Sequence, residues 1–155
     1  MTNGARIREA KKADAKAIAE VLNVQFRCGR YSRGFLRRYR NTEKKILKDM
    51  DKCDYFVIGD APSEVSGVIS LLLMRGTCKI DDLAVREDQQ HKGLGTRLVL
   101  FAEKYARKKK CHKIWCTSSK ELKASGFYRK LGFGLEGCLR RHFDMKDILY
   151  FGKLL

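Results

Sequence analysis

The sequence predicts a single α/β domain built on one central sheet. Its length of 155 residues lies within the usual size of one domain, and 44% of the residues are apolar, so a self-sufficient core is available. Helical and strand periodicities alternate along the chain, with only one proline and no internal repeat or Pro/Gly/Ser-rich linker. We therefore expect one domain over residues 1–155, with a mixed sheet of about seven strands flanked by about four helices.

In the first half of the chain, helical patterns precede a run of strand patterns. Apolar residues recur at helical spacing from Ala13 to Leu22, with Asp14 in the first turn. The turn-forming residues 60–64 separate two apolar runs, which predicts a hairpin. A basic, aromatic stretch over 25–40 lies between the two helices. The elements expected here, in order, are a strand over 5–9, helices over 13–23 and 42–50, and strands over 54–59, 65–74 and 78–86.

The second half begins with a long helix and ends with two strands. Apolar residues from Leu94 to Tyr105 line one helical face, and three lysines at 108–110 lie where a helix C-terminus favours cations. A capping-box pattern at Ser118 opens a further helix, which a glycine closes at position 132. The strands expected here cover 113–117, 133–143 and 148–154.

The charge of the chain is unevenly distributed. The sequence has 34 Lys and Arg against 18 Asp and Glu, a formal net charge of +16. Residues 27–48 contain nine bases and one acid, and residues 104–113 contain six bases and no acid, whereas residues 49–88 contain nine acids and four bases. Two basic segments therefore flank an acidic middle, and each is a candidate surface for an anionic ligand or partner.

Other features exclude a membrane span and favour a reducing compartment. The longest apolar run, residues 68–74, is far shorter than the ~18 residues of a spanning helix, and the start of the chain has no apolar segment typical of a signal peptide. The cysteines form neither a C-x-x-C pair nor a spacing suited to zinc; they are Cys28, Cys53, Cys78, Cys111, Cys116 and Cys138. We expect reduced, mostly buried thiols, no metal and a cytoplasmic location.

The sharpest local pattern is Gln90-His-Lys-Gly93-Leu-Gly95-Thr96, between a strand that ends in Leu83-Ala-Val85 and the long helix. Glycines let the backbone approach a ligand, and the first amides of a helix are unpaired donors at the positive end of its dipole, so the turn suits a pyrophosphate. The Walker A pattern and the dinucleotide fingerprint are absent, which disfavours nucleoside triphosphates and NAD. A plain strand-to-helix connection is the alternative interpretation.

Together with Phe127-Tyr128-x-x-Leu131-Gly132-Phe133 downstream, this turn and the strand before it resemble the GNAT family of acetyl-CoA-dependent N-acetyltransferases. The resemblance extends over nearly the whole chain, from Ile7-Arg-Glu-Ala10, a common opening in the family, to the paired strands at the C-terminus. It implies a GNAT-like domain with acetyl-CoA as co-substrate, in which an acceptor amine attacks acetyl-CoA directly in a ternary complex.

The resemblance also implies roles for individual residues. Backbone groups of Leu83, Ala84 and Val85 would hydrogen-bond the pantetheine arm. Tyr128 matches the family tyrosine that protonates the leaving thiolate, and a phenol at the end of the cofactor is able to supply that proton. A half-buried helix aromatic is the alternative interpretation of Tyr128. The pyrophosphate would be held by the turn, whose residues are Gln90, His91, Lys92, Gly93, Leu94, Gly95, Thr96 and Arg97.

The general base has two candidates, Asp81 and Asp82. An attacking amine starts as an ammonium with a pKa of ~10.4 and must lose a proton. On a strand the two side chains point to opposite faces, so only one is expected to reach the cleft. Many family members have a Glu at the position of Lys79 here, and others have an acid at the position of Asp82, which favours Asp82. A relay through water is the alternative.

The acceptor amine stays open among a protein N-terminus, a lysine, a polyamine and a small-molecule amine. In the family the segment matching 27–48 borders the acceptor site, so its basic rim suggests an acidic peptide, a ribonucleoprotein component or another anionic acceptor. A solvated charged face is the simpler interpretation. We expect a monomer or a homodimer.

A nucleic-acid-binding module is the rival function. Aromatics at positions 31, 35 and 39 are interleaved with arginines, a pattern able to stack bases and neutralise phosphates. The same spacing fits one buried helix stripe with arginines outward, and no RRM, KH or zinc-knuckle pattern is present, so nucleic acid is not favoured. A non-catalytic acetyl-CoA-binding protein is the third alternative.

Overall fold

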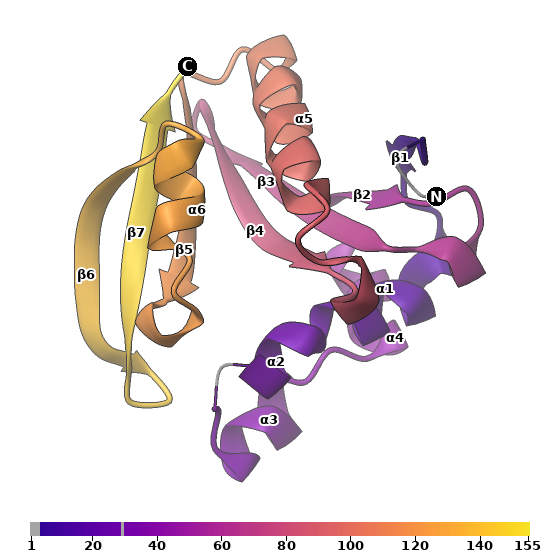
Figure 1. The fold of residues 1–155 in the computed structure, drawn as a ribbon, viewed down its shortest axis with the longest axis horizontal. Helices are drawn as coiled ribbons and strands as arrows, with labels where there is room; N and C mark the ends of the chain where they lie inside the picture. Colours follow the sequence, from indigo (N-terminus) through magenta and orange to yellow (C-terminus); the bar gives the residue numbers. More distant parts are fainter. Residues whose placement is uncertain (1–3, 29) are drawn as a thin grey trace.

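Residues 4–28 and 30–155 are described by a computed structural model, in which one seven-stranded sheet carries helices on both faces (Figure 1). The strand order is β1-β2-β3-β4-β5-β7-β6. Strands β4 and β5 are parallel, and the other neighbouring pairs are antiparallel. This mixed sheet confirms the predicted α/β fold class.

The helices and strands follow the predicted order, except that the basic, aromatic stretch forms two short helices of its own. The strands are β1 (Ile7–Glu9), β2 (Asp54–Ile58), β3 (Gly67–Met74), β4 (Thr77–Val85), β5 (Lys113–Ser119), β6 (Gly134–Phe143) and β7 (Lys146–Leu154). The helices are α1 (Ala15–Leu22), α2 (Val24–Cys28), α3 (Arg33–Tyr39), α4 (Glu43–Asp49), α5 (Leu94–Lys108) and α6 (Ser125–Lys130).

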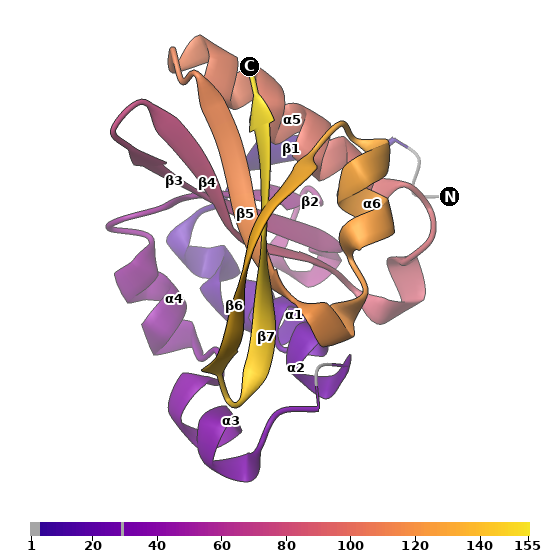
Figure 2. The ribbon, with the colours of Figure 1, turned by 90° about the vertical axis from the view of Figure 1, so that its left-hand side faces the viewer.

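Two apolar clusters cover opposite faces of the sheet. Alternate residues of β2, such as Phe56, pack under α5, whose Leu98 is fully buried. The intervening residues, such as Val57, pack under α1 and α4, whose Ile18 and Ile46 are also fully buried. Figure 2 shows α1 and α4 together on one side of the strands and α5 beyond the other. The alternation of side chains along each strand therefore produces one core for each helical layer.

The predicted helix over 118–132 is wrong in extent. Ser118 and Ser119 continue β5 and pair with Leu149 and Ile148 of β7, so their backbone groups belong to the sheet. A short 3₁₀ turn follows over Lys120–Leu122, and α6 begins only at Ser125. The capping-box pattern at Ser118 therefore lies inside a strand, because pairing with β7 overrides the local signal.

The aromatic stripe at 31, 35 and 39 is also not buried as predicted. Helix α3 has no buried residue, and Tyr39 is 48% exposed. The rings pack on one another instead: Tyr31 and Phe35 stack with centroids 4.7 Å apart, and Phe35 and Tyr39 are 4.6 Å apart. Helix α3 lies below the lower end of the sheet in Figure 1.

The cysteines lie mostly in the interior. Cys53, Cys78, Cys111 and Cys116 are buried free thiols and Cys138 is exposed, while the side chain of Cys28 lies outside the described residues. Within the described ranges, none of the helices is both long enough and apolar enough to cross a membrane.

Candidate active site

The parallel pair β4 and β5 separates part-way along its length. Pairing covers only Thr77–Ile80 of β4 against Lys113–Cys116 of β5. Beyond it, β4 stays paired with β3 and β5 stays paired with β7, so the two strands diverge and their facing edges are left open (Figure 1). The strand that precedes the Gly-rich turn therefore presents free backbone groups towards the gap.

Strand alternation decides which of these backbone groups face the gap. The Arg86 amide donates to the Ser66 carbonyl at 2.8 Å, towards β3. Because hydrogen-bonding direction alternates along an antiparallel strand, Ala84 also faces β3, whereas Leu83 and Val85 face the open side. Of the three predicted backbone contacts for a pantetheine arm, the structure thus directs those of Leu83 and Val85 to the gap.

The Gly-rich turn leads directly into α5. Gly93 has a φ of 77°, in the left-handed region that glycine adopts without strain, and precedes the first residue of the helix. The Arg97 amide donates to the Gly93 carbonyl at 3.0 Å. The amides of the three preceding residues, Leu94 to Thr96, have no acceptor within the helix and lie at its positive end. This arrangement fits an anion such as a pyrophosphate.

The polar side chains of the turn contact protein groups. Gln90 Nε2 donates to the Val85 carbonyl at 3.2 Å, and Lys92 Nζ donates to the Asp88 carbonyl at 3.0 Å. Arg97 Nη2 donates to the Ala5 carbonyl at 2.7 Å, which ties α5 to the segment before β1. These side chains hold the turn in shape, so its capacity for an anion rests on the backbone amides.

Gly95 lies where the turn, β4 and α6 meet. A Cβ atom added to Gly95 would lie 3.5 Å from Cζ of Phe127 and 4.0 Å from Cγ2 of Val85. These are ordinary van der Waals distances, so one methyl group fits but a larger side chain would fill the space between β4 and α6. Glycine at this position keeps that passage open.

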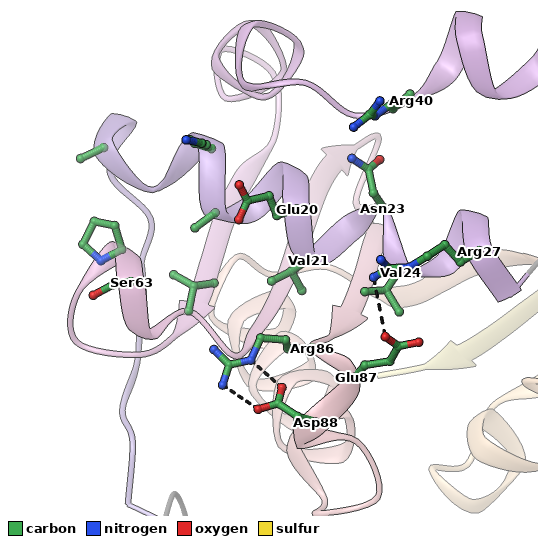
Figure 3. Close-up of a pocket in the computed structure, with 15 residues that line it drawn as sticks. Glu20, Val21, Asn23, Val24, Arg27, Arg40, Ser63, Arg86, Glu87 and Asp88 are labelled. Carbon is green, nitrogen blue, oxygen red and sulfur yellow. Dashed lines mark hydrogen bonds and ion pairs between the residues drawn. The ribbon is translucent and has the colours of Figure 1, made fainter.

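A cavity of about 450 Å³ lies in the gap between β4 and β5. It brings together Asp81 and Leu83 of β4, Thr117 of β5 and Tyr128 of α6. A larger hollow of about 820 Å³ lies between α1, α2 and the segment after β4 (Figure 3). That hollow contains none of the site residues predicted from sequence, so we take the smaller cavity as the candidate active site.

Tyr128 is 6% exposed, yet it lines this cavity. Its ring packs against Phe133 and stacks on Phe151 with centroids 5.1 Å apart. Burial, together with the neighbouring Cys116 thiol, holds the pKa of the Tyr128 phenol well above its usual range. Burial also raises the pKa of the Cys116 thiol to about 12. Both groups therefore stay protonated at neutral pH, and the phenol is a proton donor held in place by its ring.

The two aspartates do not point to opposite faces as predicted. Strand β4 bulges opposite the junction of Ser70 and Leu71, so Asp81 has no partner in the β3 register. Asp81 forms an ion pair with Lys79, and Asp82 accepts a hydrogen bond from Ser70 Oγ at 3.0 Å. A bulge adds one residue to the strand and shifts its alternation by one, which brings both carboxylates to the face covered by α1.

Asp81 lines the cavity, whereas Asp82 does not. The Asp82 carboxyl is turned towards β2 and β3, where Tyr55 and Ser70 are its hydrogen-bond donors. Burial raises the pKa of Asp82, and the nearby charge of Asp81 raises it further. The family pattern favours Asp82 as the general base, but the Asp82 side chain does not line the cavity.

Asp82→Asn is expected to raise the free energy of unfolding by about 1 kcal/mol near neutral pH. Because the folded-state pKa of Asp82 is raised, folding pays for ionising this carboxyl at every pH above that value. The gain should shrink as the pH falls through ~3.9 and vanish below it, where the carboxyl is protonated in both states. Urea unfolding of both proteins at about pH 8 and about pH 4 measures this. An equal increase in the free energy of unfolding at both pH values would contradict a raised pKa for Asp82.

Two further residues of the cavity were not named among the expected site residues, although Tyr31 lies in the segment 27–48 that the resemblance places beside the acceptor site. Tyr31 and Phe143 line the cavity, and the loop before α3 contacts the turn between β6 and β7. There Asp144 accepts from the Ser32 amide at 2.6 Å, and Lys146 Nζ lies 5.4 Å from the centre of the Tyr31 ring. The contact between the two segments is not marked in the sequence, because 112 residues separate Ser32 from Asp144.

Comparison with known proteins identifies one family. The sequence model of the acetyltransferase (GNAT) family matches residues 16–133. No curated protein matches the chain significantly.

Several solved structures share the fold. PaiA N-acetyltransferase from Thermoplasma acidophilum, in complex with coenzyme A, has a TM-score of 0.75 at 21% identity, covering 95% of this chain and 98% of its own. Ribosomal-protein-alanine N-acetyltransferase from Brucella melitensis has a TM-score of 0.77 at 20% identity, covering 97% and 99%. A Bacillus subtilis acetyltransferase in complex with CoA has a TM-score of 0.75 at 20% identity, covering 97% and 99%.

Proposed function

Because this chain belongs to the acetyltransferase (GNAT) family, we propose that it is an N-acetyltransferase, which transfers the acetyl group of acetyl-CoA directly to an acceptor amine. The observation that carries this proposal is that the open edge of β4 and the Tyr128 phenol lie at one gap in the sheet, with the start of α5 beside it, where Gly95 lies close to Val85 and Phe127. Two of the structures with this fold contain CoA.

The residues present fit such a co-substrate. Acetyl-CoA supplies a thioester carbonyl as the electrophile. The open backbone groups of Leu83 and the amide of Val85 can hold an extended amide-containing arm as a strand neighbour would. The amides of Leu94 to Thr96 face an anion at the helix start. Tyr128, whose raised pKa keeps its hydroxyl protonated, donates a proton to the departing sulfur.

We propose Asp81 as the group that receives the proton of the acceptor amine, directly or through one water. It is the carboxylate that lines the cavity, and it forms an ion pair with Lys79. Asp82 lies behind it and accepts a hydrogen bond from Ser70 Oγ.

Asp81→Asn is expected to lower the turnover rate about a hundredfold near neutral pH, because the amine then has no carboxylate to receive its proton. The loss should diminish as the pH rises towards ~10, where more of the acceptor is already neutral. Initial rates measured across this pH range, with Asp82→Asn as the matched control, test the assignment. A rate loss that does not change with pH, or a larger loss in the control, would remove Asp81 from this role.

The acceptor class is tested by measuring release of the CoA thiol with four kinds of amine: a peptide N-terminus, a lysine side chain, a polyamine and a small-molecule amine. The proposed function predicts transfer to at least one of them. One protein of this fold is described as a ribosomal-protein-alanine N-acetyltransferase, which makes the peptide N-terminus the first candidate. Binding of acetyl-CoA without transfer to any class would instead support the non-catalytic alternative.

A further inference from the structure

A pocket on the outer side of α2 has an apolar floor and a cationic rim. It encloses about 520 Å³ between α2 and α3, with Phe26 and Leu36 as its apolar residues. Arg27, Arg37 and Arg40 surround them, and no acidic residue lines the pocket. All three arginines are exposed, whereas Phe26 and Leu36 are half-buried. The pocket therefore suits a ligand in which an apolar group is flanked by negatively charged groups.

The arginines of this rim are largely uncommitted. Arg27 lies 3.8 Å from Glu87 in an exposed pair, a geometry that contributes little stability (Figure 3). In the parts of the chain that the structure describes, Arg37 and Arg40 have no acidic partner. Arginine groups that remain unpaired beside an apolar surface favour a partner with carboxylates.

The pocket is held in shape from both sides. Asn23 at the end of α1 and Asn41 before α4 exchange hydrogen bonds, each 2.9 Å long, between the side chain of one and the backbone of the other. Phe26 packs edge-on against Tyr31 and Phe35, with centroids 5.4 and 6.2 Å apart. Because these contacts join α1, α2 and α3, a ligand would not have to order the site on binding.

We propose that this pocket binds an apolar side chain of an acidic polypeptide segment. The apolar floor takes one aliphatic or aromatic side chain, and the arginine rim pairs with carboxylates on either side of it. RNA fits less well, because binding of single strands uses free aromatic faces, and here Tyr31 and Phe35 stack on each other with only 14° between their planes.

The second part of this inference rests on the proposed function: the acidic segment belongs to the protein whose amine is acetylated. Helix α2 separates the pocket from the reaction cavity, and neighbouring residues line both. Gln25 lines the cavity and Phe26 the pocket, while Tyr31 of the cavity packs on Phe26. The residues that adjoin a segment anchored in the pocket would therefore lie beside the cavity taken as the candidate active site.

Binding is measured by fluorescence polarisation, without acetyl-CoA, using a labelled peptide of glutamates around one leucine with a blocked N-terminus. The double variant Arg37→Glu/Arg40→Glu should bind it about tenfold more weakly or worse. The matched control, Lys104→Glu/Arg107→Glu, makes the same charge change at the same spacing on exposed positions of α5 and should bind like the native protein. Replacing the glutamates by glutamine, or the leucine by serine, should each weaken binding to the native protein.

The proposed binding site would be overturned if both double variants lost affinity for the peptide equally, or if the native protein bound the glutamine peptide as tightly as the glutamate peptide. It would also be overturned by an RNA oligonucleotide of equal charge that displaces the peptide and depends on Arg37 and Arg40. The link to acetyl transfer has a separate readout. An acceptor with a free amine and the acidic segment should have a lower KM than one without the segment, in the native protein but not in the Arg37→Glu/Arg40→Glu variant. An unchanged KM would overturn that link while leaving the binding result in place.

Discussion

Acetyl-CoA is expected to bind Gly95→Leu about a hundredfold more weakly than the native protein, a loss of about 3 kcal/mol. A Cβ at this position already contacts Phe127 and Val85 at ordinary distances, so the branched end of leucine must occupy the passage between β4 and α6. The proposed path from the start of α5 to the open edge of β4 crosses this passage. Isothermal titration with acetyl-CoA measures the loss.

The matched control is Gly95→Ala. Its methyl group would lie 3.5 Å from the Phe127 ring, which is normal contact, so acetyl-CoA affinity should stay within a few-fold of native. The thermal unfolding midpoint of both variants separates a blocked passage from a damaged fold. If Gly95→Leu remains folded and binds acetyl-CoA as tightly as the native protein does, the proposed path is wrong.

Tyr128→Phe is expected to lower turnover about a hundredfold or more while leaving acetyl-CoA affinity nearly unchanged. The substitution keeps the ring that packs against Phe133 and Phe151 and removes only the hydroxyl that would protonate the departing sulfur. Since the pKa of this phenol lies well above its usual range, the native rate should not fall through its deprotonation at moderately alkaline pH.

Tyr105→Phe provides the control for Tyr128→Phe. The Tyr105 hydroxyl donates to Asp54 and does not line the cavity, so its removal should leave the rate unchanged. Steady-state rates and acetyl-CoA titrations of both variants give the comparison. An unchanged rate in Tyr128→Phe would exclude the hydroxyl as the proton donor.

Much of the fold follows from local patterns in the sequence. The hairpin β2–β3 matches its two apolar runs and the turn between them. Helix α4 begins where Thr42 accepts a hydrogen bond from the Lys45 amide, as its N-cap pattern indicates. The Gly-rich turn was found because its glycines and helix start are contiguous in the chain. Features of this kind can be predicted from the sequence because each is formed by residues that are close together in the chain.

The rest depends on contacts between distant segments. Alternation along β4 alone predicted that Asp81 and Asp82 point to opposite faces of the sheet. A bulge against β3 brings both to the same face, and no residue pattern within β4 marks this bulge. Pairing of Ser118 with β7 likewise turned an expected helix start into strand. The contact of Ser32 with Asp144, next to the cavity residues Tyr31 and Phe143, joins segments that carry no shared signal.

Hydrogen exchange with and without acetyl-CoA tests the central claim most directly, because it reports on the backbone amides to which the binding is assigned. Protection should appear in peptides covering the open edge of β4 at 81–85 and the turn and helix start at 91–97. Residues 13–24 and 62–65, which line the larger hollow beside α1, should exchange as before. Protection confined to that hollow, or no protection at 81–97 at saturating acetyl-CoA, would contradict the account.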